Sequence, residues 1–201
     1  MITLKLGPVS TNCYLLINGR SHETIIIDPA DDGERIRERC EKEKAVPVAV
    51  FLTHGHFDHI GAAGYLKDAY NIPVCVGEKE KEIINDPALN CSFMAGSAIR
   101  VIGDRFFKDG ETFETAGFSI KVIQTSGHTI GGVCYYLKDE NILFSGDTLF
   151  HNGYGRTDLP TGDADTLFAS IREKLFALPG NTVVYPGHES ETTLEAERKH
   201  F

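Results

Sequence analysis

The chain has 201 residues, enough for a substantial core, and we expect one domain over residues 1–201. Hydrophobic residues make up 41% and charged residues 24%, close to the globular average, which excludes a disordered chain. The formal net charge of -9 argues against a nucleic-acid binder, because such proteins usually present a basic face.

Apolar runs separated by turn signals predict the strands of the first half. Asn18-Gly19 lies between two of these runs and is a strong hairpin signal, so these two strands should pair antiparallel. Pro73 has no N–H to donate, which places its strand at the edge or start of a sheet. The predicted strands are residues 13–17, 24–27, 48–52 and 72–76.

Two helices and an irregular segment complete the first half. Residues 31–44 have a helical composition and a narrow apolar stripe, which indicates a surface helix. A shorter helix is expected over residues 61–70. Between Gly77 and Gly96 the pattern weakens, which fits either a binding loop or a linker. Its charge run, residues 78–82, is typical of a solvated helical face.

The second half returns to alternation and contains the clearest helix. Residues 163–178 have an apolar stripe, an acidic start that can cap the helix, and Pro179-Gly180 to end it. A polar, helical tail is expected from Glu191. The predicted strands of this half are residues 118–123, 133–137, 141–145 and 182–185.

The order of elements repeats weakly between the halves. A strand ending in an acid, then a helix, then a strand ending in a histidine occurs twice, with Asp28 and His54 in the first copy and Asp147 and His188 in the second. This repeat predicts an α/β fold in which two sheets pack face to face with helices outside. The architecture is a four-layered αββα sandwich, with the site where both sets of strand ends meet.

The distribution of the eight histidines is the strongest functional signal. Four of them follow apolar strands or lie in glycine turns, where a side chain projects into a crevice rather than into the core, and His59 completes the first cluster. Three others, His22, His151 and His200, are expected to be ordinary surface or hydrogen-bonded residues. The clustered set is His54, His56, His59, His128 and His188, with the carboxylates Asp58 and Asp147 in similar settings.

Imidazole nitrogens and carboxylate oxygens suit zinc, iron and manganese. His54 and His56 are two positions apart on an extended segment and can reach one ion, whereas Asp58 and His59 enter a turn and can point to a second. A carboxylate can bridge two ions about 3.5 to 4 Å apart, and such pairs activate a bridging water. The pattern therefore predicts a site for one or two divalent metal ions.

The compartment is expected to be the cytoplasm. The five cysteines are scattered and form no Cys-x-x-Cys, which fits buried thiols in a reducing environment. No apolar stretch approaches the length of a membrane span, and Met1 to Leu6 do not resemble a signal peptide. We expect no membrane partner, and the oligomeric state is left open.

The motif His-x-His-x-Asp-His at residues 54–59, with the later His128, Asp147 and His188, resembles the metallo-β-lactamase superfamily over nearly the whole chain. Within it, residues 145–150, 155–160 and 186–189 resemble the short bacterial members of the glyoxalase II group, the hydroxyacylglutathione hydrolases. The resemblance implies one metal held by His54, His56 and His128, a second held by Asp58, His59 and His188, and Asp147 as the bridge.

The activity implied by this resemblance is that of a dinuclear metallohydrolase. It would cleave a small-molecule acyl thioester, or a related activated acyl bond, through a metal-bridging hydroxide, with Asp58 also able to accept a proton. Zinc is the expected metal, and iron or manganese would also suit. Cysteine commonly stands at the position of Asp147 in true β-lactamases, and glutamate at that of His56 in flavodiiron proteins, so neither activity is expected.

Two alternatives use the same residues. One is a mononuclear iron persulfide dioxygenase, whose iron is held by the equivalents of His54, His128 and Asp147; the other is a lactonase.

Two residues that follow Asp147 in the sequence are candidate substrate ligands. Arg156 is expected first to order its loop through a carboxylate and second to bind an anionic substrate. Tyr154 either donates to a developing oxyanion or packs as an ordinary aromatic side chain.

Overall fold

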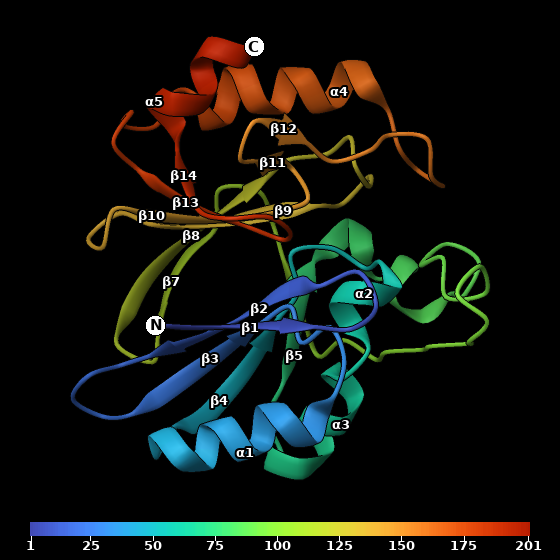
Figure 1. Ribbon diagram of the computed structural model, residues 1–201, viewed down its shortest axis with the longest axis vertical. Helices are drawn as coiled ribbons and strands as arrows, with labels where there is room; N and C mark the ends of the chain where they lie inside the picture. Colours follow the sequence, from blue (N-terminus) through green and yellow to red (C-terminus); the bar gives the residue numbers. More distant parts are fainter.

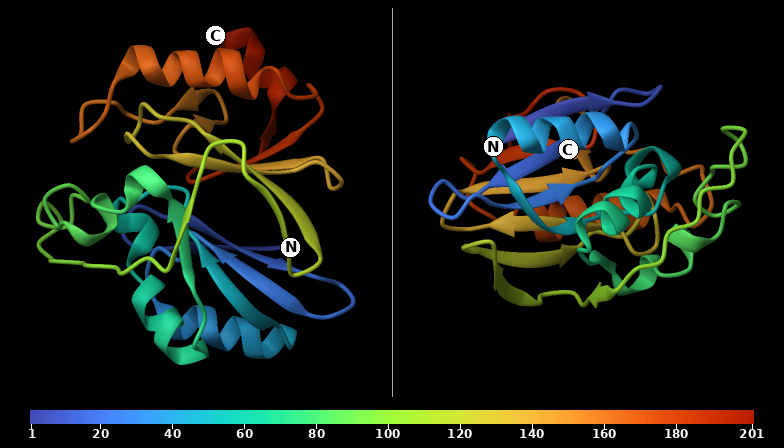
Figure 2. Two further views of the ribbon diagram at one scale, coloured as in Figure 1. Left: turned by 180° about the vertical axis from the view of Figure 1, so that it is seen from behind. Right: turned by 90° about the horizontal axis from the view of Figure 1, so that it is seen from below.

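The computed structural model describes residues 1–201 as two six-stranded mixed sheets that face one another, with helices on both outer faces (Figures 1 and 2). This is the predicted four-layered αββα sandwich. None of its helices combines the length and the apolar character that crossing a lipid bilayer requires.

The first sheet is built in chain order. The strands are β1 (Ile2–Leu6), β2 (Thr11–Ile17), β3 (Glu23–Ile27), β4 (Val46–Phe51), β5 (Val74–Gly77) and β6 (Arg105–Phe107). The pairs β1–β2 and β2–β3 are antiparallel, and the three pairs from β3 to β6 are parallel.

The second sheet has the spatial order β14-β13-β10-β9-β8-β7 and is antiparallel except between β10 and β13. A separate hairpin, β11 (Leu149–Phe150) and β12 (Gly153–Tyr154), follows β10. The strands of the sheet are β7 (Thr112–Thr115), β8 (Phe118–Gln124), β9 (Val133–Leu137), β10 (Ile142–Gly146), β13 (Val183–Pro186) and β14 (Thr192–Thr193).

The helices cover the outer faces, as Figure 1 shows. The first sheet carries α1 (Gly33–Glu43) and α3 (Ala63–Tyr70), and the second carries α4 (Ala164–Ala169), which continues as a π-helix to Leu175, and α5 (Leu194–Glu197). The short α2 (Phe57–Ile60) instead lies at the strand ends. The remaining elements are three 3₁₀ helices, Glu78–Glu80, Ile83–Asn85 and Arg198–His200.

Each interface between layers has its own hydrophobic cluster. The cluster between the sheets contains Phe51, Tyr135 and Phe144, and it is flanked by one cluster under α1 and α3 and another under α4. The apolar stripe predicted for residues 163–178 explains the cluster under α4, because Leu167, Ile171 and Leu175 are all fully buried. Burial on both faces accounts for the nearly continuous apolar runs of the central strands.

The structure corrects several details of the sequence interpretation. Strands β1, β6 and β7, the hairpin of β11 and β12, and the short helix α2 were not predicted, and β14 follows the strand that was expected to be last. Strand β5 is not at an edge of the sheet, because β6 pairs with it on its outer side. Pro73 lies just before the first residue of β5. The charge run at residues 78–82 is not uniformly solvated, since Glu80 is completely buried.

Candidate metal centre

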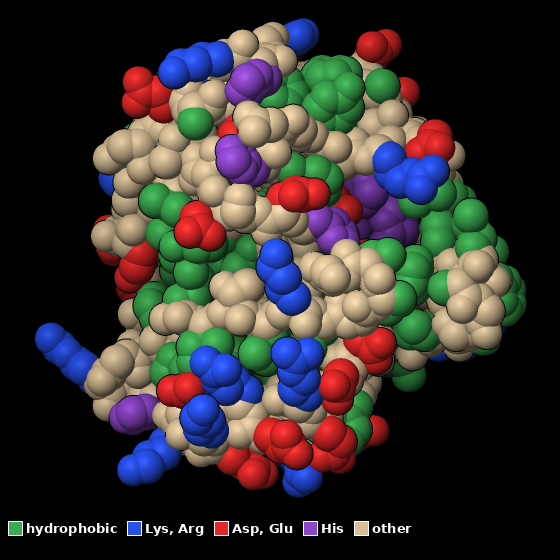
Figure 3. Space-filling model, in the orientation of Figure 1, with side chains coloured by type: hydrophobic (Ala, Val, Ile, Leu, Met, Phe, Trp, Pro, Cys, Tyr) green, Lys and Arg blue, Asp and Glu red, His purple; other side chains and the backbone are tan.

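The seven predicted ligands come together at the ends of the facing sheets, where Figure 3 shows histidine and acidic side chains gathered in a hollow. Within each of three overlapping groups, the candidate ligand atoms lie within 4.8 Å of one another. The groups are His54 with His56 and His128, His54 with His59 and Asp147, and Asp58 with His59 and His188.

Strand ends place these side chains. His54 and His56 follow β4, Asp147 follows β10, and His188 follows β13, each at the carboxyl end of a parallel strand. His128 comes from the loop between β8 and β9. Carboxyl ends of parallel strands open into a crevice, which is why residues so distant in sequence share one site.

The loop that contains His188 is tied to the first sheet. The Tyr14 hydroxyl and the Asn12 side-chain amide, both on β2, donate to the Pro186 carbonyl at 2.6 and 3.0 Å. At the neighbouring strand end, Gly146 has a φ of 49° and leaves no room for a side chain, since a Cβ there would lie 2.3 Å from the Thr53 hydroxyl oxygen. The two halves are therefore in direct contact at the site.

Hydrogen bonds determine which ring nitrogens of the first group face the hollow. His128 donates from Nδ1 to the Arg156 carbonyl at 2.7 Å, and in this tautomer its Nε2 carries a free lone pair. The Thr53 hydroxyl donates to Asp28 at 2.7 Å, so it accepts from His54 Nδ1 at 3.2 Å and leaves His54 Nε2 unprotonated. Both lone pairs point inward.

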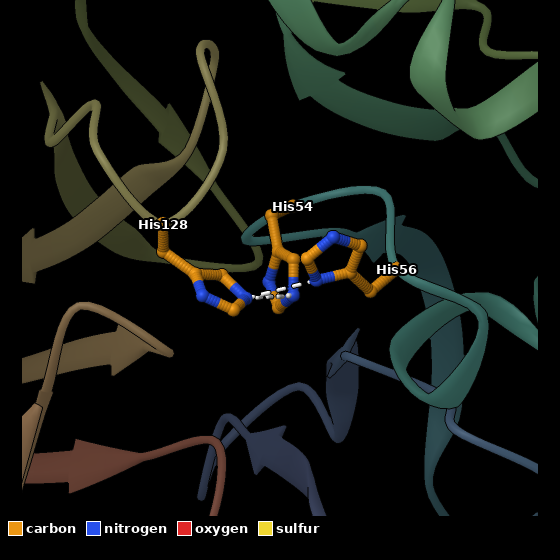
Figure 4. Close-up of side chains that lie close together, drawn as sticks. All are labelled: His54, His56 and His128. Carbon is orange, nitrogen blue, oxygen red and sulfur yellow. Dashed lines mark hydrogen bonds between the residues drawn. The ribbon is translucent and has the colours of Figure 1, made fainter. Parts of the chain in front are cut away.

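Three ring nitrogens of the first group converge on one point. His54 Nε2 and His56 Nδ1 lie 3.2 and 2.8 Å from His128 Nε2, and the three rings converge as Figure 4 shows. The lone pairs of His54 Nε2 and His128 Nε2 repel at their distance, whereas a divalent cation between them would accept both. Three buried atoms of the predicted ligands have no hydrogen-bond partner, namely His56 Nε2, His59 Nε2 and Asp147 Oδ1. The donor set therefore fits a metal.

The second group is oriented by Asp28, a residue that the sequence analysis did not assign to the site. His59 donates from Nδ1 to Asp28 Oδ2 at 3.0 Å, which turns His59 Nε2 toward Asp147 Oδ1, 3.3 Å away. Asp28 also accepts from the Thr53 amide and hydroxyl. The available signal was its place in the strand-acid repeat, at the end of β3. Metal-binding histidines usually donate their other N–H in this way.

The carboxylates Asp58 and Asp147 lie between the histidines. Asp58 accepts from the Thr11 hydroxyl at 3.1 Å and lies 3.3 Å from His188 Nε2. Asp147 Oδ2 lies 3.6 Å from His128 Nε2 and 3.5 Å from His188 Nε2, so it faces ligands of both the first and the second group.

Protonation states follow from burial and from these neighbours. Burial lowers the pKa of His56 to about 3 and lowers the pKa of His54 well below its ordinary value, so both rings are neutral. Burial would raise the pKa of Asp147, but the adjacent His59 outweighs this and lowers it. Burial likewise opposes a charge on His59, yet Asp147, Asp58 and Asp28 raise its pKa. Neutral imidazoles and ionised carboxylates are the forms that bind metals, so His54, His56 and Asp147 already have these forms, whereas His59 would release a proton when a metal binds.

A cleft of about 420 Å³ opens over the site and is lined by five of the seven residues, namely His56, Asp58, His128, Asp147 and His188. Its apolar walls include Phe57, Phe150 and Leu159, and Cys91 from the irregular segment after β5 also contributes. The two predicted substrate residues line it as well. Arg156 forms an exposed, two-pronged ion pair with Asp158 (2.6 and 2.7 Å), and Tyr154 packs edge-on against Phe168. Their roles toward a substrate stay predictions.

The remaining histidines lie outside the cleft. His22 and His200 are exposed, and His151 is exposed with Nδ1 at 2.9 Å from the Ser190 hydroxyl. The expectation that they are ordinary surface residues is confirmed.

Comparison with known sequences identifies similar proteins along the full length. The profile of the metallo-β-lactamase superfamily matches residues 6–188. A probable metallo-hydrolase, YqgX of Bacillus subtilis, is 37% identical over 97% of this chain and 92% of its own. The hydroxyacylglutathione hydrolase GloC of Haemophilus influenzae is 35% identical over 98% of this chain and 96% of its own.

Comparison with solved structures also identifies similar proteins along the full length of the chain. The B3 metallo-β-lactamase BLEG-1 superposes with a TM-score of 0.95 at 40% identity, covering 99% of this chain and 96% of its own. TTHA1623 in a di-iron-bound form superposes with 0.89 at 34% identity, covering 100% and 98%. ETHE1 from Myxococcus xanthus superposes with 0.78 at 28% identity, covering 100% and 83%.

Proposed function

Because this chain belongs to the metallo-β-lactamase superfamily, we propose that it is a glyoxalase II-like metal-dependent hydrolase, which cleaves a thioester or related activated acyl bond. The observation that carries the proposal is the convergence of seven ligand side chains as two groups that open onto one cleft. The similarity to GloC, named a hydroxyacylglutathione hydrolase, supports the thioester class.

Two divalent cations fit the donor set. His54, His56 and His128 would hold one, Asp58, His59 and His188 the other, and Asp147, which faces both groups, would lie between them. When bound, such a pair supplies Lewis acidity and lowers the pKa of water to near neutrality. Zinc is the proposed metal, with iron as the alternative because TTHA1623 is described in a di-iron-bound form.

The side chains around the cations have separate roles. The apolar walls of the cleft bind the acyl group and exclude bulk water, which strengthens every electrostatic interaction inside. Asp58, held by the Thr11 hydroxyl, is placed to accept a proton during attack on the carbonyl carbon. Arg156 and Tyr154 at the cleft are the residues that we propose contact the substrate.

Replacing Asp58 with alanine tests the two-metal hydrolase. We expect D58A to bind one metal where the wild type binds two and to lose thioester turnover by about 100- to 10,000-fold, the range for losing a general acid or base. Metal content is measured by mass spectrometry and turnover by thiol release. The exposed Asp68→Ala serves as the matched control. Unchanged metal content and turnover in D58A would contradict the proposal.

A persulfide dioxygenase is the second candidate, and the similarity to ETHE1 is the observation that favours testing it. Metal analysis of anaerobically purified protein is combined with oxygen uptake on glutathione persulfide. One iron per chain with oxygen consumption would favour the dioxygenase, and two metals with thiol release would favour the hydrolase. The same screen includes lactones, and also β-lactams because of the similarity to BLEG-1.

A further inference from the structure

Glu80 is a buried carboxylate outside the seven-residue set. It ends the 3₁₀ helix Glu78–Glu80, which follows β5, and its side chain has no exposed surface, whereas Glu78 in the same helix is exposed. Burying an ionisable group is costly unless it is hydrogen-bonded, so its partners indicate what it does.

Each carboxylate oxygen of Glu80 binds a backbone amide from a different ligand loop. The Gly55 amide donates to Oε2 at 2.7 Å, and the Gly131 amide donates to Oε1 at 2.9 Å. Gly55 lies between His54 and His56 in the loop after β4 of the first sheet. Gly131 lies three residues beyond His128 in the loop before β9 of the second sheet.

The three segments are packed closely around this carboxylate. A Cβ at Gly131 would lie 2.5 Å from the Lys79 carbonyl carbon and 2.6 Å from the Glu80 nitrogen, so no larger residue fits there. Next to it the Val133 amide donates to the Thr53 carbonyl at 2.8 Å, a second link between the two sheets. The carboxylate is thus a bridge within a rigid frame.

We propose that Glu80 is a positioning residue that sets the distance between the His54–His56 pair and His128. The inference rests on the proposed metal site. Glu80 would position the ligands of that site through the backbone of their loops, without touching any ligand side chain. Only a carboxylate can accept on both oxygens, so one group connects both loops. Ligand sites lose function when their supporting contacts shift by about 0.5 Å.

Replacing Glu80 with glutamine tests the proposal, because E80Q keeps the side-chain volume but turns one acceptor into a donor that faces an amide N–H. Zinc affinity is measured by competition with a chelating dye in two backgrounds. D58A leaves the first ligand group complete, and there we expect E80Q to weaken zinc binding by about 10- to 100-fold. H56A leaves the second group complete, and there we expect no change. Glu78→Gln is the matched control in both backgrounds.

The outcomes are distinguishable. Equal zinc affinity of D58A and folded D58A/E80Q would overturn the positioning role, and so would an equal loss in both backgrounds, which indicates a general structural effect. If D58A itself binds no zinc, the proposed function fails. Amide hydrogen exchange of the metal-free protein then decides on Glu80 alone.

In that measurement we expect the Gly55 or Gly131 amide to exchange at least about 10-fold faster in E80Q than in the wild type, since one of the two amides loses its acceptor oxygen. Unchanged exchange of both amides would overturn the inference. Circular dichroism checks the fold. If E80Q does not fold, E80D, which keeps both acceptors on a shorter side chain, is measured in its place with the same expected losses.

Discussion

Hydrogen bonds from single side chains decide which atom of each histidine faces the cleft. Asp28 is the clearest case, because one of its carboxylate oxygens accepts from both Thr53 and His59. Thr53 in turn orients His54. A residue that contacts no cation can therefore determine the ring nitrogen presented by two candidate ligands.

The Asp28→Asn substitution tests this. Asparagine replaces one acceptor by an NH₂ group, so His59 or Thr53 loses its partner, and we expect zinc affinity to fall by about 10- to 100-fold. The free energy of unfolding should fall by about 1 to 3 kcal/mol, because a buried polar group is left unpaired. Dye competition and urea titration measure the two effects. The exposed Asp68→Asn is the control, and unchanged zinc affinity in D28N would refute the role.

Glu80 also predicts a pH dependence of stability. Burial raises its pKa from 4.5 to about 7, so the folded chain holds this proton more tightly than the unfolded chain does. The stabilisation is complete below about pH 4.5 and is lost as the pH rises through about 7. From about pH 5 to about pH 8, the free energy of unfolding of the wild type should fall by roughly 1 to 3 kcal/mol relative to E80Q.

Urea titrations of both metal-free proteins at the two pH values measure this difference. The histidines titrate in both proteins and cancel in the comparison. A difference between the wild type and E80Q that does not change with pH would show that Glu80 keeps an ordinary pKa.

Helix α4 connects the hydrophobic cluster beneath it to the loop that contains His128. Asp163 caps the helix by accepting from the Thr166 amide at 2.8 Å, and its own amide donates to the Gly127 carbonyl at 2.7 Å, next to His128. Leu167 then lies against Gly127, where a Cβ would approach the Leu167 amide nitrogen to 2.3 Å. The first turn of the helix therefore holds the base of the His128 loop.

We expect Asp163→Ala to lower the free energy of unfolding by about 0.5 to 2 kcal/mol through loss of the cap. Because the backbone bond to Gly127 is kept, zinc affinity should change less than in D28N. Urea titration and dye competition measure both quantities, with the exposed Glu173→Ala on the same helical segment as the control. An equal loss of stability in both variants would argue against the cap.

The complete fold is needed for the first ligand group, since His54 and His56 belong to the first sheet and His128 to the second. A cation bound there would stabilise the folded chain only, because the unfolded chain does not bring the two sheets together. Free zinc at about 100 times its dissociation constant should add about 2.7 kcal/mol to the free energy of unfolding.

Thermal unfolding with zinc and with a chelator measures this stabilisation. His56→Ala and His128→Ala should lose a similar share of it, although their residues belong to different sheets. A loss in only one of these variants would show that a single sheet binds the ion.

Much of this fold could be predicted without coordinates. The apolar runs and their breaks predicted eight strands and four helices of the sandwich, and the strand-acid, strand-histidine repeat predicted two facing sheets. The failures were local. Strand β1 has only five residues, two of them buried, and β14 has two residues, so neither leaves a clear period. The burial of Glu80 was hidden because its neighbours in the charge run are solvated.

The pattern of residues was sufficient to predict the fold class and to single out the seven side chains that the structure brings together, because burial periodicity and donor chemistry are local properties of the chain. The orientation of those ligands was not predictable. Asp28 and Glu80 act through hydrogen bonds to residues 25 to 51 positions away, and only the packing of one sheet on the other brings such groups within bonding distance.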